Sequence, residues 1–380
     1  MYLKKLHLSA FRNYLEETLE LAHQKTILLG NNAQGKSNIL EAVELLATLK
    51  SHRTNRDSDL ILEGFSTGKI VATVEDKYGI SDLAIILRSP GRRTLTLNHE
   101  NLRRQMEFLG SLNAVQFSSL DLDLVRGSPD VRRNWLDTLL VQLEPIYASI
   151  IDQYYQVLRQ RNALLKNIRK TTSETSKSAN LSDQISQLYL WDQQLAETGS
   201  RVIRRRSRVV QRLIPLAQNW HKNISGGQEI LNIDYLPNVF CNQDEPLQVQ
   251  QAFLDKIEER RLAEQQLGTS VVGPHRDDVK FTINQTPAKS YGSQGQQRTL
   301  VLALKLAELQ LIEEVIGEPP LLLLDDVLAE LDPNRQNQLL EVIQNRFQTL
   351  ITTTYLHSFD AQWLQSSQIL KVESGKIHYY

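Results

Sequence analysis

The sequence lacks most of the features that mark secreted or membrane-bound proteins. It holds one cysteine, Cys241, which excludes an internal disulfide and suits a reducing compartment. Residues 1–14 lack the continuous apolar run of a signal peptide, and no segment approaches the roughly 18 apolar residues that a membrane-spanning helix needs. We therefore expect a cytoplasmic protein that has no membrane partner.

The sequence also lacks a large excess of positive over negative charge, or of negative over positive. The sequence has 43 Lys and Arg residues against 44 Asp and Glu residues, a formal net charge of −1. A surface for nucleic acid must then be a local patch. With 41% hydrophobic and 23% charged residues, the composition is that of a globular protein. Because 380 residues exceed what one hydrophobic core usually supports, we expect two domains.

Strand and helix patterns alternate at both ends of the chain. Residues 1–9 alternate as a half-buried strand, residues 26–29 form an apolar strand before a helix over 36–49, and residues 70–98 predict β-structure with turns at 77–79 and 89–91. After Ser270 the pattern predicts a strand over 279–284, a helix over 296–316 and a strand over 321–324. This order predicts an α/β fold, a mixed sheet with helices.

Between these parts, apolar residues recur at helical spacing. Examples are Leu136, Leu139, Leu140 and Leu143. We expect Pro145 and Pro215 to interrupt the helices, and residues 170–180, rich in Ser, Thr and Lys, to form a loop. No repeat or sustained heptad is present, and about 140 residues are too few for a long coiled-coil rod. The sequence predicts a head of residues 1–130 and 268–380 that carries an inserted, mostly α-helical arm, residues 131–267.

One segment fits the phosphate-binding P-loop pattern G-x-x-x-x-G-K-[ST]. The strand before it and the helix after it are the context that this motif requires, although a chance glycine turn is the alternative. Its glycines let backbone N–H groups approach phosphate oxygens, and the helix N-terminus adds positive partial charge. We expect Lys36 to reach the β- and γ-phosphates of ATP and the Ser37 hydroxyl to ligate Mg²⁺. The residues assigned to ATP are Gly30, Asn31, Asn32, Ala33, Gln34, Gly35, Lys36, Ser37 and Asn38.

A pair of carboxylates, Asp325 and Asp326, supplies the second half of such a site. The four leucines before them predict a buried parallel strand whose end delivers the carboxylates to a nucleotide crevice. We expect Asp325 to hold Mg²⁺ through water and Asp326 to polarise the attacking water as a catalytic residue, together with Lys36. The alternative is an ordinary strand followed by an acidic helix cap.

A second glycine-containing turn precedes these carboxylates by about thirty residues. It leads into a helix that starts near Gln296, which again makes an anion cradle. The turn looks like the signature motif of ABC ATPases, which completes the site of the opposite subunit; the alternative is a helix cap that binds nothing. Its residues are Ser293, Gln294, Gly295, Gln296 and Gln297.

Further segments resemble the RecF family of recombination-repair ATPases. They are Phe11–Tyr14, Gly127–Asp137, Trp191–Asp192 with Leu195–Ala196, Gly273–Asp278 and Leu324–Asp332. Together with the P-loop and the signature, the resemblance covers nearly the whole chain. Its weakest parts are residues 170–180 and 220–246. The implied fold is an ABC-type ATPase head with a helical arm.

The resemblance assigns roles to single residues near the nucleotide. Gln116 is similar to the Q-loop glutamine that senses Mg²⁺ and the γ-phosphate, so the resemblance implies a catalytic and metal-site residue; it can equally be a polar residue at a strand end. Arg12 is similar to an N-terminal basic residue that contacts nucleotide in SMC-like heads. Glu330 and Asp332 resemble the D-loop, which communicates across a dimer.

The switch position departs from the usual pattern of this superfamily, which has histidine there. The segment Leu350–Tyr355 offers threonines, of which we assign Thr354 as a catalytic residue, with Thr353 one position away. Without a histidine, and with Asp rather than Glu at position 326, the site is expected to hydrolyse ATP slowly.

Arginines gather in two places, and both are candidate contacts for DNA phosphates. One is the predicted arm helix, with Arg204, Arg205 and Arg206; the other is the β-rich half of the head, with Arg53, Arg56, Arg92, Arg93, Arg103 and Arg104. Such residues would give salt-sensitive binding that tolerates any DNA sequence. A solvated charged face is the alternative for the arm helix.

The resemblance also implies a function in recombinational repair and replication-fork maintenance. ATP would join two heads into a homodimer that clamps single- and double-stranded DNA at gaps or junctions, and the slow hydrolysis of a weak ATPase would release it. The implied partners are RecO and RecR, with which the protein would help to load RecA. Two alternatives stay open. One is an ABC subunit of a membrane transporter, which would need no arm and would have a switch histidine. The other is a structural dimeriser that binds ATP without hydrolysing it.

Overall fold

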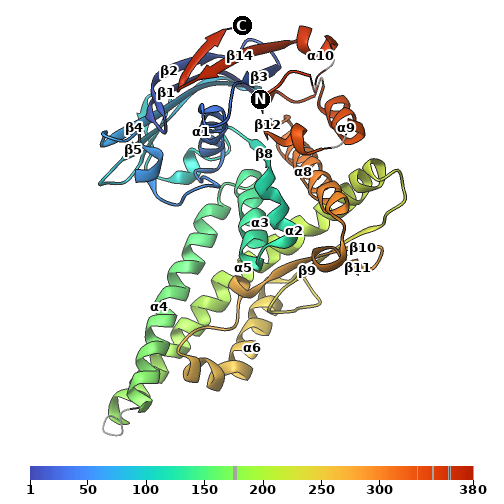
Figure 1. Ribbon diagram of the computed structural model, residues 1–380. Helices are drawn as coiled ribbons and strands as arrows, with labels where there is room; N and C mark the ends of the chain where they lie inside the picture. Colours follow the sequence, from blue (N-terminus) through green and yellow to red (C-terminus); the bar gives the residue numbers. More distant parts are fainter. Residues whose placement is uncertain (174–177, 332, 345, 358, 360, 380) are drawn as a thin grey trace.

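The computed structural model describes residues 1–380 except 174–177, 332, 345, 358, 360 and 380. A head of two six-stranded sheets and their helices lies at one end, and long helices project from it (Figure 1). None of the helices in the described ranges combines the length and hydrophobicity that a bilayer crossing requires.

The first sheet is antiparallel and begins the head. Its order is β2-β1-β4-β5-β6-β7. The strands are β1 (Tyr2–Phe11), β2 (Tyr14–Glu20), β4 (Thr67–Asp76), β5 (Gly79–Arg88), β6 (Thr94–Leu97) and β7 (Glu100–Asn101). Leu6 and Leu8 of β1 are fully buried, whereas His7 and Ser9, which alternate with them, are half-buried. This confirms the half-buried strand that the alternation predicted. The β-structure and both turns predicted within residues 70–98 are confirmed.

The second sheet has the order β15-β14-β3-β13-β12-β8 and is parallel except for β15. Its strands are β3 (Lys25–Leu29), β8 (Ala114–Ser118), β12 (Leu321–Asp325), β13 (Thr349–Thr353), β14 (Ser367–Glu373) and β15 (Lys376–Tyr379). Leu321–Leu324 are buried between β8 and β13, which confirms the predicted parallel strand. The carboxyl ends of β3, β8, β12 and β13 therefore meet at one edge of the sheet.

Helix α1 (Lys36–Thr48) lies between the two sheets and contacts strands of both, with one main hydrophobic core around it. Helix α8 (Gln294–Ile316) packs on β8 from the other side and confirms the predicted long helix. The shorter helices are α2 (Asp123–Arg126), α3 (Pro129–Leu143), α7 (Ala288–Tyr291), α9 (Pro333–Ile343) and α10 (Ala361–Gln365). Most of α3 falls within the residues predicted for the arm, and that boundary stays a prediction. Short 3-10 turns are Asp57–Leu60, Gln105–Glu107, Ser119–Leu122, Pro274–Arg276 and Val327–Glu330.

The arm consists of α4 (Tyr147–Ser173), α5 (Ser178–Ile224) and α6 (Pro246–Leu267), which pack on one another (Figure 1). With 47 residues, α5 is about 70 Å long and reaches back to α8 in the head. Beside them, β9 (Leu231–Leu236) pairs with β10 (Asp278–Ile283), which also pairs with β11 (Thr286–Pro287). The predicted boundary between arm and head near residue 268 stays a prediction. The small sheet crosses it, because β9 precedes this boundary in the chain and β10 follows it.

Two sequence predictions within the arm were wrong. Pro215 does not interrupt a helix but lies inside α5, which continues to Ile224. Packing of buried neighbours such as Leu213 and Ala217 offsets the about 3 kcal/mol that an internal proline costs. Residues 170–173 and 178–180 are helical rather than a loop, because extending a formed helix costs little; residues 174–177 lie outside the described residues. Pro145, as predicted, separates α3 from α4.

The prediction that Arg206 contacts DNA is also wrong, because its side chain is fully buried. Its guanidinium donates two hydrogen bonds to Asp137, at 2.9 and 2.8 Å, and one to the Pro274 carbonyl at 2.7 Å. Asp277 lies 3.3 Å from the same guanidinium, and burial raises the pKa of Asp277 to about 6 despite this pairing. The inner face of α5 therefore uses Arg206 to join the arm to the Pro274–Arg276 turn.

Replacing Arg206 with methionine should lower the free energy of unfolding by about 3–5 kcal/mol, because Asp137 and Asp277 lose their buried counter-charge. Urea unfolding measures the change. The matched control is Arg205→Met, since Arg205 pairs with Glu144 at 2.9 Å where both side chains reach solvent, and its loss should stay below about 1 kcal/mol. Equal losses in the two variants would contradict this account of the buried cluster.

Candidate nucleotide site

The P-loop follows β3 and enters α1 at the carboxyl edge of the parallel sheet. Both of its glycines are required by their surroundings. A Cβ atom at Gly30 would lie 2.4 Å from the Val372 carbonyl oxygen, and Gly35 has a φ of 115°. The Lys36 side chain is buried, and its Nζ donates to the carbonyls of Gly30 at 2.8 Å and Asn31 at 3.0 Å. The lysine thus closes the loop. A bound phosphate could replace the two carbonyls as the acceptor of its hydrogen bonds.

Two neighbouring turns support the P-loop from outside. Asn13 donates to the Gln34 carbonyl at 3.0 Å, and Tyr14 donates to the Gly35 carbonyl at 2.9 Å. On the other side the backbone N–H of Ser374 donates to Gln34 Oε1 at 2.7 Å. Residues 31–33 are exposed at the rim, while Asn38 donates to Asn13 at 2.7 Å. Sequence reasoning gave Asn13 and Tyr14 no role, because only the folded chain brings the β1–β2 turn beside the P-loop.

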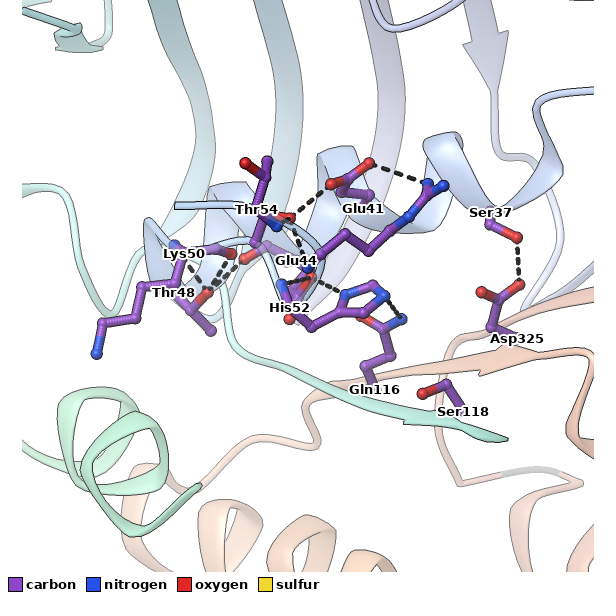
Figure 2. A network of polar contacts seen from close by, with 12 residues as sticks. Ser37, Glu41, Glu44, Thr48, Lys50, His52, Thr54, Gln116, Ser118 and Asp325 are labelled. Carbon is purple, nitrogen blue, oxygen red and sulfur yellow. Dashed lines mark hydrogen bonds and ion pairs between the residues drawn. The ribbon is translucent and has the colours of Figure 1, made fainter. Parts of the chain in front are cut away.

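The two residues predicted to hold Mg²⁺ lie together, as Figure 2 shows. The Ser37 hydroxyl donates to Asp325 Oδ1 at 2.8 Å, although the residues are 288 positions apart in the chain. The Thr352 hydroxyl donates to the same oxygen, also at 2.8 Å. A hydroxyl and a carboxylate are oxygen ligands of the kind that Mg²⁺ prefers, and Mg²⁺ usually keeps several waters at such a site.

Asp326 follows in a left-handed backbone conformation with a φ of 53°. Its N–H donates to the Thr352 hydroxyl at 2.9 Å, which fixes the turn at the end of β12. Burial raises the pKa of Asp326 above its usual range, and Lys36 opposes that effect. The sequence shows three consecutive threonines but does not indicate which of them meets the carboxylate. The strand register shows it, because Thr352 pairs with Asp325.

The threonine assigned to the switch, Thr354, directly follows β13 and is half-buried. Its neighbour Thr353 is occupied within its own turn, because its hydroxyl donates to the Tyr355 carbonyl at 2.9 Å. The switch role of Thr354 stays a prediction.

Arg12 is held by the acidic face of α1. Its guanidinium donates to Glu41 at 2.8 and 2.6 Å and to the Asp59 carbonyl at 2.8 Å. Burial raises the pKa of Glu41, but the hydrogen bond and charge of Arg12 outweigh this and lower it. Arg53 joins the cluster and donates to Asn38 at 2.7 Å. Arg12 is thus the counter-ion of a fully buried carboxylate, and its predicted contact with nucleotide stays a prediction.

Gln116 lies within β8, where it pairs with Leu323 of β12. Its side chain lies beside His52, with the two Nε2 atoms 3.5 Å apart (Figure 2). Burial lowers the pKa of His52, but the carboxylates of Glu44, Glu41 and Asp325 raise it above its ordinary value. His52 therefore lies within the electrostatic reach of the Ser37–Asp325 pair, which nothing in its sequence position indicated.

The serine turn begins α8 and closes on itself. The Ser293 hydroxyl accepts from the Gln296 N–H at 3.2 Å, and Gln296 Oε1 accepts from the Ser293 N–H at 2.9 Å. Ser293 and Gln294 are exposed, whereas Gln297 is buried and donates to the Ala288 carbonyl at 2.9 Å. The turn is thus a closed helix cap whose first two residues are exposed.

The serine turn and the P-loop begin different helices: the serine turn caps α8, whereas the P-loop leads into α1. Lys305, in the middle of α8, pairs with Asp121 at 2.9 Å, directly after the end of β8. Ser293 lies about 18 Å farther along the helix axis at 1.5 Å per residue. One chain therefore presents a P-loop and a serine turn at separate places. The D-loop prediction, Glu330 and Asp332, stays a prediction, because the side chain of Glu330 and the whole of Asp332 lie outside the described residues.

The other predicted DNA contacts divide into exposed and paired arginines. Arg56, Arg92, Arg103 and Arg104 are exposed and lie in the segments that connect or flank the strands of the antiparallel sheet. Arg93 is half-buried and donates to Asp57 and, at 2.6 Å, to the Leu49 carbonyl. In the arm, Arg204 pairs with Asp244 at 2.6 Å and Arg205 with Glu144. The exposed arginines of the head remain the candidates for phosphate contacts.

Comparisons with known proteins place the chain. The family model described as the RecF/RecN/SMC N terminal domain matches residues 2–377. The chain is 84% identical over 378 residues to the DNA replication and repair protein RecF of Rippkaea orientalis, with 100% of each chain covered. It is 77% identical over 377 residues to the RecF protein of Crocosphaera subtropica, with 99% of each covered.

Solved structures agree. A structure of the recombination mediator protein RecF-ATP in the RecFOR pathway matches with a TM-score of 0.89 and 31% identity, and the match covers 100% of this chain and 97% of that one. The Smc head domain of Pyrococcus furiosus, at 14% identity and a TM-score of 0.55 over 100% of this chain and 96% of that one, shares the fold. The fold is therefore that of an ABC-type ATPase head, and the chain belongs to the RecF family.

Proposed function

We propose that this protein is an ATP-controlled DNA-binding protein of recombinational repair and replication. The observation that carries the proposal is the hydrogen bond between Ser37 and Asp325 beside the lysine-closed glycine loop. This arrangement fits a triphosphate with its cation. The solved relative described as RecF-ATP, similar over the whole chain, supports ATP as the nucleotide.

The residues present fit a magnesium ion. Mg²⁺, when bound, would neutralise charge on the β- and γ-phosphates. Ser37 and Asp325 would hold it, the second through water, and Thr352 would keep Asp325 oriented by its hydrogen bond. Lys36 would turn its Nζ from the loop carbonyls to the phosphates. Asp326 would accept the proton of the attacking water, and its raised pKa suits a general base.

Two copies of the chain would complete each site. The exposed serine turn at the positive N-terminus of α8 suits the γ-phosphate held by the P-loop of a second copy. ATP would thus hold two heads together, and hydrolysis would separate them. The carboxylate at 326 is one methylene shorter than a glutamate, which is consistent with slow turnover and a role as a timer.

The DNA surface would be the exposed arginine side of the antiparallel sheet, at Arg56, Arg92, Arg103 and Arg104. The closed dimer would clamp single- and double-stranded DNA at gaps or junctions, and RecO and RecR would act with it to load RecA. Relatives described as DNA replication and repair proteins support this role. The transporter alternative finds no support, since the family model over residues 2–377 is that of RecF, RecN and SMC proteins.

Asp326→Asn should slow phosphate release by about 10²–10⁴-fold, because the amide cannot accept the proton of the attacking water. ATP-driven dimerisation, followed by sedimentation, should survive. Asp152→Asn, an exposed carboxylate of α4, is the matched control and should leave the rate unchanged. Unchanged turnover in Asp326→Asn would remove this residue from the mechanism, and dimerisation without any wild-type turnover would favour the structural dimeriser.

A gapped duplex should bind more tightly with ATP than without it, and more weakly as salt rises, because phosphate contacts release counterions. Fluorescence anisotropy across a salt series measures both effects. Replacing Arg103 and Arg104 with alanine should reduce the slope of log affinity against log salt by about 2. The same pair of changes at Arg201 and Arg208 of the arm is the control. Salt-insensitive binding that ignores ATP would contradict the clamp.

A further inference from the structure

One face of α1 carries a polar stripe that runs away from the nucleotide site (Figure 2). Ser37, Glu41, Glu44 and Thr48 follow one another at spacings of three or four residues, so they share that face. Ser37 meets Asp325, and Glu41 holds Arg12. Glu44, one turn farther, has no part in the proposed function, yet it holds a histidine.

Glu44 fixes His52 through two hydrogen bonds. Glu44 Oε2 accepts from the ring Nδ1 at 2.6 Å and from the His52 backbone N–H at 3.3 Å. The side chains are only 20% and 16% exposed, for His52 and Glu44 respectively. With Nδ1 engaged by the carboxylate, Nε2 is the ring atom left for other contacts. Glu44 therefore fixes both the position of the ring and the direction in which Nε2 points.

That edge meets the side-chain amide of Gln116. The two Nε2 atoms lie 3.5 Å apart, and Gln116 Oε1 is buried without a hydrogen-bond partner among the residues that the structure describes. A buried polar atom without a partner is unfavourable, so this oxygen is available to a ligand. Gln116 and Ser118 pair with Leu323 and Asp325, so Gln116 lies on the same face of the sheet as Asp325. The amide is thus incompletely satisfied on the face that carries the predicted cation ligand.

A glutamine amide has two chemically different ends, an acceptor oxygen and a donor nitrogen, and its last torsion is soft. A ring fixed against one end decides which end is left for a ligand. We infer that His52, held by Glu44, is a positioning residue that sets the orientation of the Gln116 amide toward bound Mg²⁺ and the γ-phosphate. This inference rests on the proposed ATPase function.

A purely structural role for His52 is the competing explanation. In that case the ring would only help to hold residues 50–54 against α1. Other contacts already do this: the Ser51 hydroxyl donates to Glu41 at 2.5 Å, and the Lys50 N–H donates to the Thr48 hydroxyl at 3.2 Å. The approach of the ring to Gln116 adds nothing to those contacts, so a positioning role accounts for it better.

The test is a double-mutant cycle on the full-length protein with His52→Ala, Gln116→Ala and the double variant. The readouts are kcat and KM for ATP, and the Mg²⁺ concentration that half-saturates the binding of a fluorescent, non-hydrolysable ATP analogue. We expect His52→Ala to lower kcat by about tenfold and to raise the Mg²⁺ requirement, as loss of a residue that orients a ligand group does. KM for ATP should stay within about twofold, and His52→Ala should have no further effect once Gln116 is alanine.

Two further variants separate positioning from folding. Glu44→Gln keeps an acceptor for Nδ1 and should retain most of the rate, whereas Glu44→Ala should behave like His52→Ala. Asn55→Ala, exposed on the same loop, should leave every readout unchanged.

Additive losses of kcat in the cycle, or a His52→Ala variant whose kcat and Mg²⁺ requirement equal those of the wild type, would overturn the inference alone. A wild-type protein that releases no phosphate from ATP would overturn the proposed ATPase function, and this inference with it. Thermal unfolding of each variant shows whether a lost rate comes from lost folding; if His52→Ala does not fold, the Glu44→Gln and Glu44→Ala pair decides.

Discussion

The nucleotide site depends on one constraint, the alignment of five parallel strands whose carboxyl ends meet at one edge. Because β3, β12 and β13 are neighbours in register, Ser37, Asp325 and Thr352 reach one another although they are distant in the chain. Helix α1 then adds its positive N-terminus and a polar stripe to the same edge. Shifting β12 by one residue would turn Asp325 to the opposite face and dissolve the site.

Buried ion pairs join the long helices to one another and to α3. Arg206 of α5 is paired with Asp137 of α3, and Arg161 of α4 with Asp192 and Glu264. Trp220, near the end of α5, donates to Gln310 of α8 at 2.9 Å. The arm and the helix that carries the serine turn are therefore packed together.

Sequence patterns predicted what depends on neighbours in the chain. The P-loop, the buried strand before Asp325, the helix predicted over 296–316 and the β-rich half of the head all follow from local periodicity and turn residues. What failed depends on distant packing. The arginine pattern of α5 could not show that Arg206 turns inward to Asp137, and Pro215 could not be seen to sit in a packed helix. Thr352, Glu41 and His52 gain their roles only through strand register and helix face.

The central claim is that each triphosphate is gripped by the P-loop of one copy and the serine turn of another. Mixing two defective chains tests it: Lys36→Ala lacks a working P-loop but keeps its serine turn, and Ser293→Arg has the opposite defect. Each variant alone should fail to hydrolyse ATP. An equimolar mixture should recover about a quarter of the wild-type rate, since half of randomly formed dimers hold one intact composite site of two. No recovery in the mixture, or full activity of Ser293→Arg alone, would contradict the account.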